Sequence, residues 1–205
     1  MARDINPIVK QSRREGYALH PKATKVMSRK TGIPGQHSGG RQGKPSLYLT
    51  QLREKQKVRR IYGLLEKQFA RLVREASKTR GQTGVTLLNL LERRIDNAVY
   101  RAGFAVSRRA ARQLVGHGHF LLNGGRVDIP SIRLKEGDVL EVRPKSQKSG
   151  YFDVLPEIVA DAGQSSVSWL KSDPKKMKIE VIGTPKREEA EVGINEQLIV
   201  EFYSR

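Results

Sequence analysis

The chain has 205 residues and carries 39 Lys and Arg against 21 Asp and Glu, for a net charge of +18. This charge indicates a polyanionic partner, nucleic acid first and an anionic membrane second. The absence of cysteine excludes disulfides, thiol nucleophiles and cysteine-ligated zinc. No apolar run is long enough to span a membrane, so a soluble cytoplasmic protein without a membrane partner is expected. Residues 1–80 carry +15 and residues 151–205 carry −3, which favours an anion-binding surface in the first three quarters.

Residues 1–45 show no sustained hydrophobic period, and residues 28–46 are rich in Gly, Pro and basic side chains. Such a composition buries too little apolar surface to order itself. We therefore expect a basic, extended N-terminal arm that becomes ordered on a polyanion, with a solvated tail as the alternative.

Residues 46–92 are predicted to form a helical domain. Ser46 opens a stretch whose apolar residues recur at helical spacing, and Gly63 is expected to divide it. A second periodic helix is expected to begin at Thr86 and to end at Gly103. The basic face of the first stretch has few acidic neighbours in the sequence, which favours nucleic acid over solvent. This face also holds Lys67 and Arg74, and its candidate nucleic-acid contacts are Arg53, Lys55, Lys57, Arg59, Arg60 and Arg71.

Residues 93–150 are predicted to form a small α+β module. Ser107 is expected to cap a short helix, and a strand from Phe120 leads into the hairpin turn Asn123–Gly125. A further turn and strand follow, from residue 135 to residue 144. Asn123 and Arg126 of this hairpin are candidate RNA contacts.

The short helix carries Arg108, Arg109 and Arg112 on neighbouring positions with no acidic residue close in the sequence. Arginines spaced in this way repel one another, so the pattern favours a partner that supplies negative charge. Guanidinium groups bind phosphate through paired hydrogen bonds, and a helix N-terminus adds free N–H groups and its dipole. A solvated helix is the alternative.

His117 and His119 raise the possibility of a metal site, because imidazoles at close spacing can bind zinc. Zinc sites need three or four protein ligands, and the two other histidines lie in the arm. We therefore expect a turn between helix and strand, with no metal and no cofactor. The chain has no P-loop, no nucleophile elbow and no evident carboxylate pair, so no active site and no small-molecule substrate are expected.

The C-terminal quarter is predicted to contain strands at "KMKIEVI" and "EQLIVEFY", with residues 151–205 completing the helical domain. The fold class expected is α+β: an extended arm, a helical domain and the small module inserted before a C-terminal strand segment. Glu196 and Glu201 are candidates for a protein interface, because acidic groups there would meet a basic neighbour. Solvated acids on a core strand are the alternative.

Five stretches, "PGQH", "QLREKQKVRRIYG", "LLNLLERRIDNAVYRAGFA", "SRRAARQLVGHGHFLLNGGRVDIPS" and "NEQLIVEFYS", resemble the family of bacterial small-subunit ribosomal protein four. The resemblance runs in order along nearly the whole chain, and residues 93–148 are similar to the RNA-binding module that takes its name from the family. Some members hold zinc through N-terminal cysteines, which this sequence lacks.

The resemblance implies a non-enzymatic constituent of the small subunit that binds the 5′ domain of small-subunit rRNA and nucleates assembly. It implies contact with ribosomal protein five and an effect on translational accuracy. It also implies that Arg41 and Lys44 lie near the messenger RNA entrance, in a bacterial-type ribosome of the cytoplasm or of an organelle of bacterial origin. A free-standing RNA-binding regulator and a metal-dependent nucleic-acid enzyme are the competing interpretations.

Overall fold

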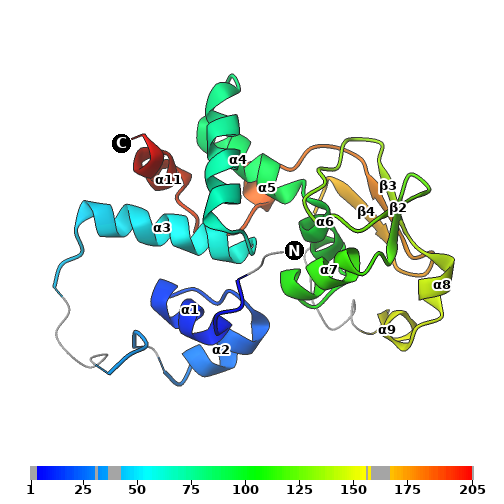
Figure 1. Cartoon of the computed structure of the whole chain (residues 1–205), viewed down its shortest axis with the longest axis horizontal. Helices are drawn as coiled ribbons and strands as arrows, with labels where there is room; N and C mark the ends of the chain where they lie inside the picture. Colours follow the sequence, from blue (N-terminus) through cyan, green and yellow to red (C-terminus); the bar gives the residue numbers. More distant parts are fainter. Residues whose placement is uncertain (1–3, 31, 37–42, 156, 158–166, 205) are drawn as a thin grey trace. The chain divides into compact units, whose positions relative to one another are not determined.

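The computed structural model describes residues 4–30, 32–36, 43–155, 157 and 167–204 (Figure 1). The fold is α+β, and the chain forms two compact units. The first, called the helical unit, comprises residues 1–87 and 193–205, and the second, the sheet unit, comprises residues 88–192. Within the described residues, no helix is both long and apolar enough to cross a membrane.

The helical unit is built around α3 (Leu47–Ile61) and α4 (Glu66–Lys78). The helix begins after Ser46 as predicted, and Ser46 caps it, since its Oγ accepts a hydrogen bond from the Leu49 N–H at 3.2 Å. Gly63 separates the two helices with a φ of +63°, a conformation that glycine adopts without strain. The predicted apolar face is buried and includes Val58, Ile61, Phe69, Leu72, Val73 and Ala76.

The expectation of an arm without regular structure is wrong for residues 8–27, which form α1 (Ile8–Glu15) and α2 (Pro21–Met27). Helices of 8 and 7 residues are too short to show a clear period in the sequence. Moreover, α1 buries polar side chains: Gln11 and Ser12 are 7% and 0% exposed. Ser12 Oγ donates a hydrogen bond to the Ile8 carbonyl at 2.9 Å, which satisfies the hydroxyl inside the unit.

The predicted C-terminal strand is also wrong, because the segment forms α11 (Glu196–Tyr203). Asn195 caps this helix by accepting a hydrogen bond from the Gln197 N–H at 3.2 Å. Three consecutive apolar residues suggested a strand covered on both faces, yet Ile199 alone among the α11 residues is buried. Only residues 193–205 of the segment expected to complete the helical domain join it, because residues 151–192 belong to the sheet unit.

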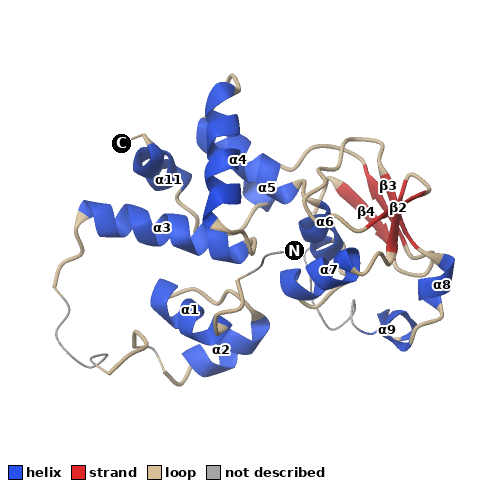
Figure 2. Ribbon diagram, in the orientation of Figure 1, coloured by secondary structure: helices blue, strands red, loops and turns tan. Residues whose placement is uncertain are grey.

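The sheet unit contains five antiparallel strands in the order β2-β1-β3-β5-β4 (Figure 2). The strands are β1 (Phe120–Leu122), β2 (Gly125–Val127), β3 (Val139–Val142), β4 (Leu170–Asp173) and β5 (Lys178–Val181). The predicted hairpin is confirmed by the positive φ angles of Asn123 and Gly124, +49° and +84°. β5 confirms the strand expected at "KMKIEVI", and its pairing with β3 explains why this segment joins the module.

The helices of the sheet unit are α5 (Thr83–Glu92), of which residues 88–92 belong here, α6 (Ile95–Arg101), α7 (Arg108–Gly116), α8 (Pro144–Gln147) and α9 (Gly150–Asp153). α6, α7 and the sheet share one apolar core, in which Phe104, Phe120, Leu140 and Ile179 are at most 1% exposed. Ser107 caps α7 as predicted, with its Oγ accepting from the Ala110 N–H at 3.3 Å.

Replacement of Gly84 by Ala is expected to lower the free energy of unfolding by about 1–3 kcal/mol, through overpacking. A Cβ at this position would lie 2.7 Å from Glu196 Cβ and 2.5 Å from its Cγ, at the base of that side chain, where a rotamer change gives little relief. Gly116→Ala in α7 is the control, because its Cβ would meet nothing within 4 Å. Urea denaturation measures both variants, and equal stabilities would contradict the close packing of Gly84 on Glu196.

Candidate nucleic-acid interface

Two of the predicted RNA contacts on α3, Arg53 and Arg60, are bound to Glu15 of α1. Arg53 Nη1 lies 3.2 Å from Glu15 Oε1, and Arg60 Nη1 contacts the same oxygen. The Glu15 side chain is fully buried, and this burial raises the pKa of its carboxyl group despite the neighbouring guanidiniums. These two arginines therefore attach α1 to α3.

The other three candidates on α3 also have acidic partners. Lys55 Nζ lies 2.8 Å from Glu66 Oε1, and Arg59 Nε lies 3.8 Å from the second oxygen of that carboxylate. Lys57 Nζ lies 2.8 Å from Glu54 Oε2 and donates a hydrogen bond to a backbone carbonyl of residue 193 at 2.6 Å. Glu66 comes from another helix, so the sequence could not place it, whereas Glu54 lies in α3 itself, three residues before Lys57.

Glu66 joins α4 to α11, since Oε1 also accepts a hydrogen bond from the Tyr203 hydroxyl at 2.7 Å. Burial alone would raise the pKa of Glu66, but hydrogen bonds from Lys55 and Tyr203 lower it below its ordinary value of 4.5. Burial and the Glu66 carboxylate raise the pKa of Tyr203, in agreement with a stable proton on its hydroxyl.

The pH dependence of stability is expected to follow from the lowered pKa of Glu66. A carboxyl group with a lowered pKa in the folded state stabilises fully above its ordinary pKa, and this contribution is lost as pH falls through the lowered value. Glu66→Gln should therefore be less stable than the natural chain at pH 7, and the gap should narrow below about pH 4.5. Urea denaturation between pH 3 and 7 measures this, and a gap independent of pH would contradict the role given to the Glu66 charge.

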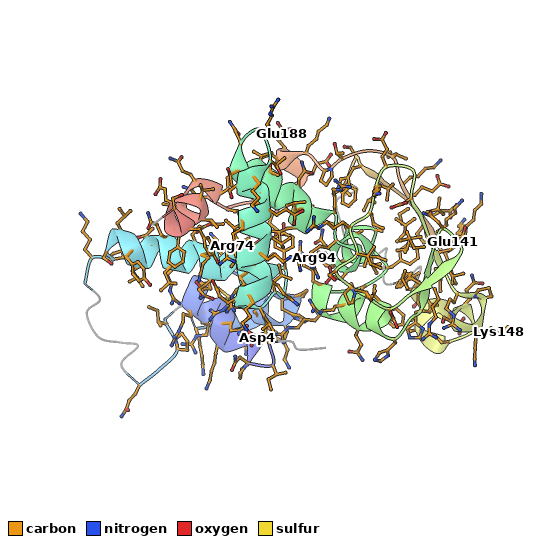
Figure 3. The ribbon with its side chains drawn as sticks, turned by 45° about the horizontal axis from the view of Figure 1, so that its top comes forward. Asp4, Arg74, Arg94, Glu141, Lys148 and Glu188 are labelled. Carbon is orange, nitrogen blue, oxygen red and sulfur yellow. The ribbon has the colours of Figure 1, made fainter. Side chains whose placement is uncertain are left out.

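Four basic side chains on α4 are exposed: Lys67, Arg71, Arg74 and Lys78, here called the α4 stripe. Of these, Arg74 is labelled in Figure 3. Spacings of four, three and four residues place them in one row. Within the described part of the chain, none of the four side chains forms an ion pair or a hydrogen bond. Arg71 was predicted as a contact, and Lys67 and Arg74 were placed on the same basic face, whereas Lys78 was not included although the same helical spacing identifies it.

The arginines of α7 fall into two classes. Arg108 Nη2 donates to Glu191 Oε1 at 2.6 Å, and Arg112 Nη1 lies 3.5 Å from Asp96 Oδ2. The expectation that these arginines have no acidic neighbour is wrong for Arg108 and Arg112. Their acidic partners come from other parts of the chain: Asp96 from α6, and Glu191 from a segment 83 residues after Arg108. Arg109 is exposed, and among the described residues its side chain has no ion-pair or hydrogen-bond partner.

The hairpin residues also differ in their roles. The Asn123 side chain closes the turn, since its Oδ1 accepts from the Val139 N–H at 2.8 Å and its Nδ2 donates to Asp138 at 2.9 Å. Arg126 is exposed and packs over Gly118, where an added Cβ would lie 2.7 Å from Arg126 Nε. Of the two candidates, Arg126 is the one that carries a charge, and that charge is exposed to solvent.

The histidine stretch forms the turn between α7 and β1. Gly118 has a φ of +70°, which reverses the chain there. His119 Nδ1 lies 3.0 Å from Ser146 Oγ. The His119 ring packs edge-on against the Phe152 ring, and the two ring centroids are 5.9 Å apart. Burial, together with His117 and Arg143, lowers the pKa of His119. Among the described residues, no group of three or more His, Asp or Glu is arranged to hold a metal ion.

Three of the four remaining candidates, Glu196, Glu201 and Lys44, lie in the described part of the helical unit. Glu201 accepts a hydrogen bond from Gln51 Nε2 at 2.9 Å, and Glu196 stands in the first turn of α11 against Gly84. Lys44 is exposed just before α3. Arg41 lies outside the described residues.

Comparison with known proteins covers the entire chain. Residues 3–92 match the family model described as ribosomal protein S4/S9 N-terminal domain, and residues 93–140 match the S4 domain. The chain is 48% identical to small ribosomal subunit protein uS4 of Roseiflexus castenholzii and 52% identical to that of Herpetosiphon aurantiacus. Both alignments cover 100% of this chain and 100% of the relative.

Proposed function

Because the chain belongs to the uS4 family of small-ribosomal-subunit proteins, we propose that it binds the 5′ domain of small-subunit rRNA and nucleates assembly of the subunit body. It is a structural, non-enzymatic ribosomal protein with an RNA-binding S4 domain. The α4 stripe is the observation that supports this proposal best, since it is an exposed row of cations without internal counterions. Such a row suits the phosphate backbone, whose neutralisation dominates the affinity of proteins for nucleic acids.

The rRNA-binding surface that we propose consists of the α4 stripe on the helical unit and of Arg109 and Arg126 on the sheet unit. Folded RNA is recognised largely through shape, phosphates and 2′-hydroxyl groups, which suits long, exposed basic side chains. The α3 cations that are bound to Glu15, Glu54 and Glu66 act chiefly in packing the helices. Asn123 acts by shaping the hairpin that carries Arg126.

A binding titration with transcribed 5′-domain RNA tests the proposed function. The purified chain should bind this RNA more tightly than a structured RNA of equal length and unrelated sequence, at magnesium and salt concentrations near those of the cell. Equal affinity for the two RNAs would contradict rRNA recognition and favour a general polyanion binder. Recovery of the chain in intact small subunits would separate a ribosomal constituent from a free-standing regulator.

We further propose that the family's contact with ribosomal protein five and its effect on translational accuracy involve the C-terminal helix. Glu196 and Glu201 on α11 are partly exposed and could meet a basic neighbour. Glu201 also holds Gln51, so its replacement would disturb α3 as well. Lys44, exposed before the N-terminus of α3, is the described candidate for contact with messenger RNA.

The charge reversal Glu196→Lys is expected to weaken contact with ribosomal protein five in assembled subunits and to increase misreading. The rRNA affinity should be nearly unchanged, because the acid lies outside the proposed phosphate surface. The control is Glu196→Gln, which preserves side-chain size against Gly84 and removes the charge. Wild-type misreading and wild-type contact in a folded Glu196→Lys protein would exclude this acid from the accuracy interface.

A further inference from the structure

A closed ring of five side chains lies in the sheet unit. Its members are Glu92 of α5, Asn97 and Arg101 of α6, Arg108 of α7, and Glu191, which follows the short helix η1 (Arg187–Glu189). Arg101 binds Glu92 through two hydrogen bonds of 2.9 and 3.0 Å, and Asn97 donates to Glu92 at 2.7 Å. Arg108 Nε donates to Asn97 Oδ1 at 2.8 Å. Glu191 completes the ring by accepting from Arg108 Nη2 at 2.6 Å and by lying 3.5 Å from Arg101 Nη2.

The two arginines are positioned by contacts other than Glu191. The Arg108 guanidinium is held by Asn97 and lies over the Tyr100 ring, 4.5 Å from its centroid. The paired hydrogen bonds to Glu92 fix Arg101, and the Glu92 residue is only 1% exposed. Each guanidinium is therefore held by contacts that do not involve the Glu191 carboxylate.

Glu191 is the member of the ring that does not lie on a helix. It lies in a segment without regular secondary structure between η1 and α11, and its neighbour Val192 is 82% exposed. By contrast, the other four members stand on helices. The Glu191 side chain is 16% exposed, so solvent and solutes reach the edge of the ring at this position.

The position of the Glu191 carboxylate has the properties of a phosphate site. One oxygen faces two guanidinium groups, which is an arrangement that phosphate oxygens favour in proteins. Arg108 opens the nine-residue helix α7, so the helix dipole adds a positive potential near the site. The exposed Arg109 follows directly and can guide a polyanion toward it.

We propose that Glu191 occupies a phosphate-binding position formed by Arg101 and Arg108, and that a backbone phosphate of the bound RNA replaces it. This inference rests on the proposed function, because it assigns one phosphate contact to that interface. The exchange substitutes one anion for another, so the arginines stay paired throughout. Any RNA that places a phosphate at this position must displace the carboxylate, so Glu191 lowers the affinity for RNA in general.

The test is Glu191→Gln in the full-length chain, titrated with 5′-domain RNA and with poly(U) over a series of salt concentrations. Removal of the internal anion should raise the affinity for poly(U) about five-fold. The slope of log affinity against log salt should steepen by about one unit, because one more phosphate now displaces solution counterions rather than Glu191. The gain for 5′-domain RNA should be of similar size.

The matched control is Glu188→Gln, which changes the net charge equally at an exposed position of η1 (Figure 3). The proposal is overturned if the two variants have the same affinities and slopes, or if Glu191→Gln binds RNA more weakly while folded by circular dichroism. Glu191→Asp provides a second variant that keeps the ring charge but shortens the reach, and it should shift affinity in the same direction by a smaller amount. Failure of the natural chain to prefer 5′-domain RNA would instead contradict the proposed function, independently of the variants.

Discussion

Replacing Lys67, Arg71 and Arg74 together by Gln is expected to weaken binding to 5′-domain rRNA about a hundred-fold at physiological salt. The slope of log affinity against log salt should fall by about three units, roughly one for each lost phosphate contact. The physical reason is that these cations form no ion pair within the described structure. An RNA phosphate can therefore bind them without breaking an internal contact. Filter binding over a range of salt concentrations gives both quantities.

The control for this variant removes the same charge elsewhere. Lys171, Lys175 and Lys186 are exposed cations of the net-negative C-terminal quarter, and their replacement by Gln should change the slope by less than about one unit. Equal losses in the two triple variants would show that rRNA binding follows net charge rather than the α4 stripe. Circular dichroism should show that both variants are folded, since surface substitutions rarely change stability strongly.

Arg108→Ala is expected to lower the free energy of unfolding by about 2–3 kcal/mol, because Asn97 loses its donor and Glu191 loses its closest cation. Arg109→Ala, at the next position along α7, should change the unfolding free energy by less than about 0.5 kcal/mol while reducing the salt slope by about one unit. Urea denaturation and RNA titration measure these effects. Equal stabilities for the two variants would contradict the assignment of Arg108 to the ring.

The features that the sequence predicted correctly depend on local rules. Ser107 was recognised as a cap because its side chain satisfies an N–H group within the same turn, and Ser46 was recognised as the start of a helical stretch. Gly63 was recognised as a break because glycine weakens a helix interior, and the Asn123–Gly125 turn because positive φ angles restrict the residue type. The long amphipathic helix α4 has enough residues to display its period. Short helices such as α1, α2 and α11 do not, and tertiary packing decides their form: α1 and α11 pack on α3, and α2 packs on α1.

The pairing of charges could not be predicted, because it joins residues that are distant in sequence. Glu15 reaches Arg53 and Arg60 across 38 and 45 residues, and Glu191 reaches Arg108 across 83. Counting acids near an arginine therefore overestimated the number of cations that are available to RNA. The α4 stripe was the accessible signal, since four exposed cations in one row along a long helix suit a phosphate backbone.

Chemical footprinting of arginine and lysine side chains, read by mass spectrometry with and without 5′-domain RNA, tests most directly whether exposed, unpaired cations form the rRNA surface. We expect Lys67, Arg71, Arg74 and Arg109 to react in the free protein and to be protected in the complex. Arg60 and Arg94, which are held by Glu15 and Asp96, should react little in either state. Unchanged reactivity of Arg71, Arg74 and Arg109 in a saturated complex would contradict the account.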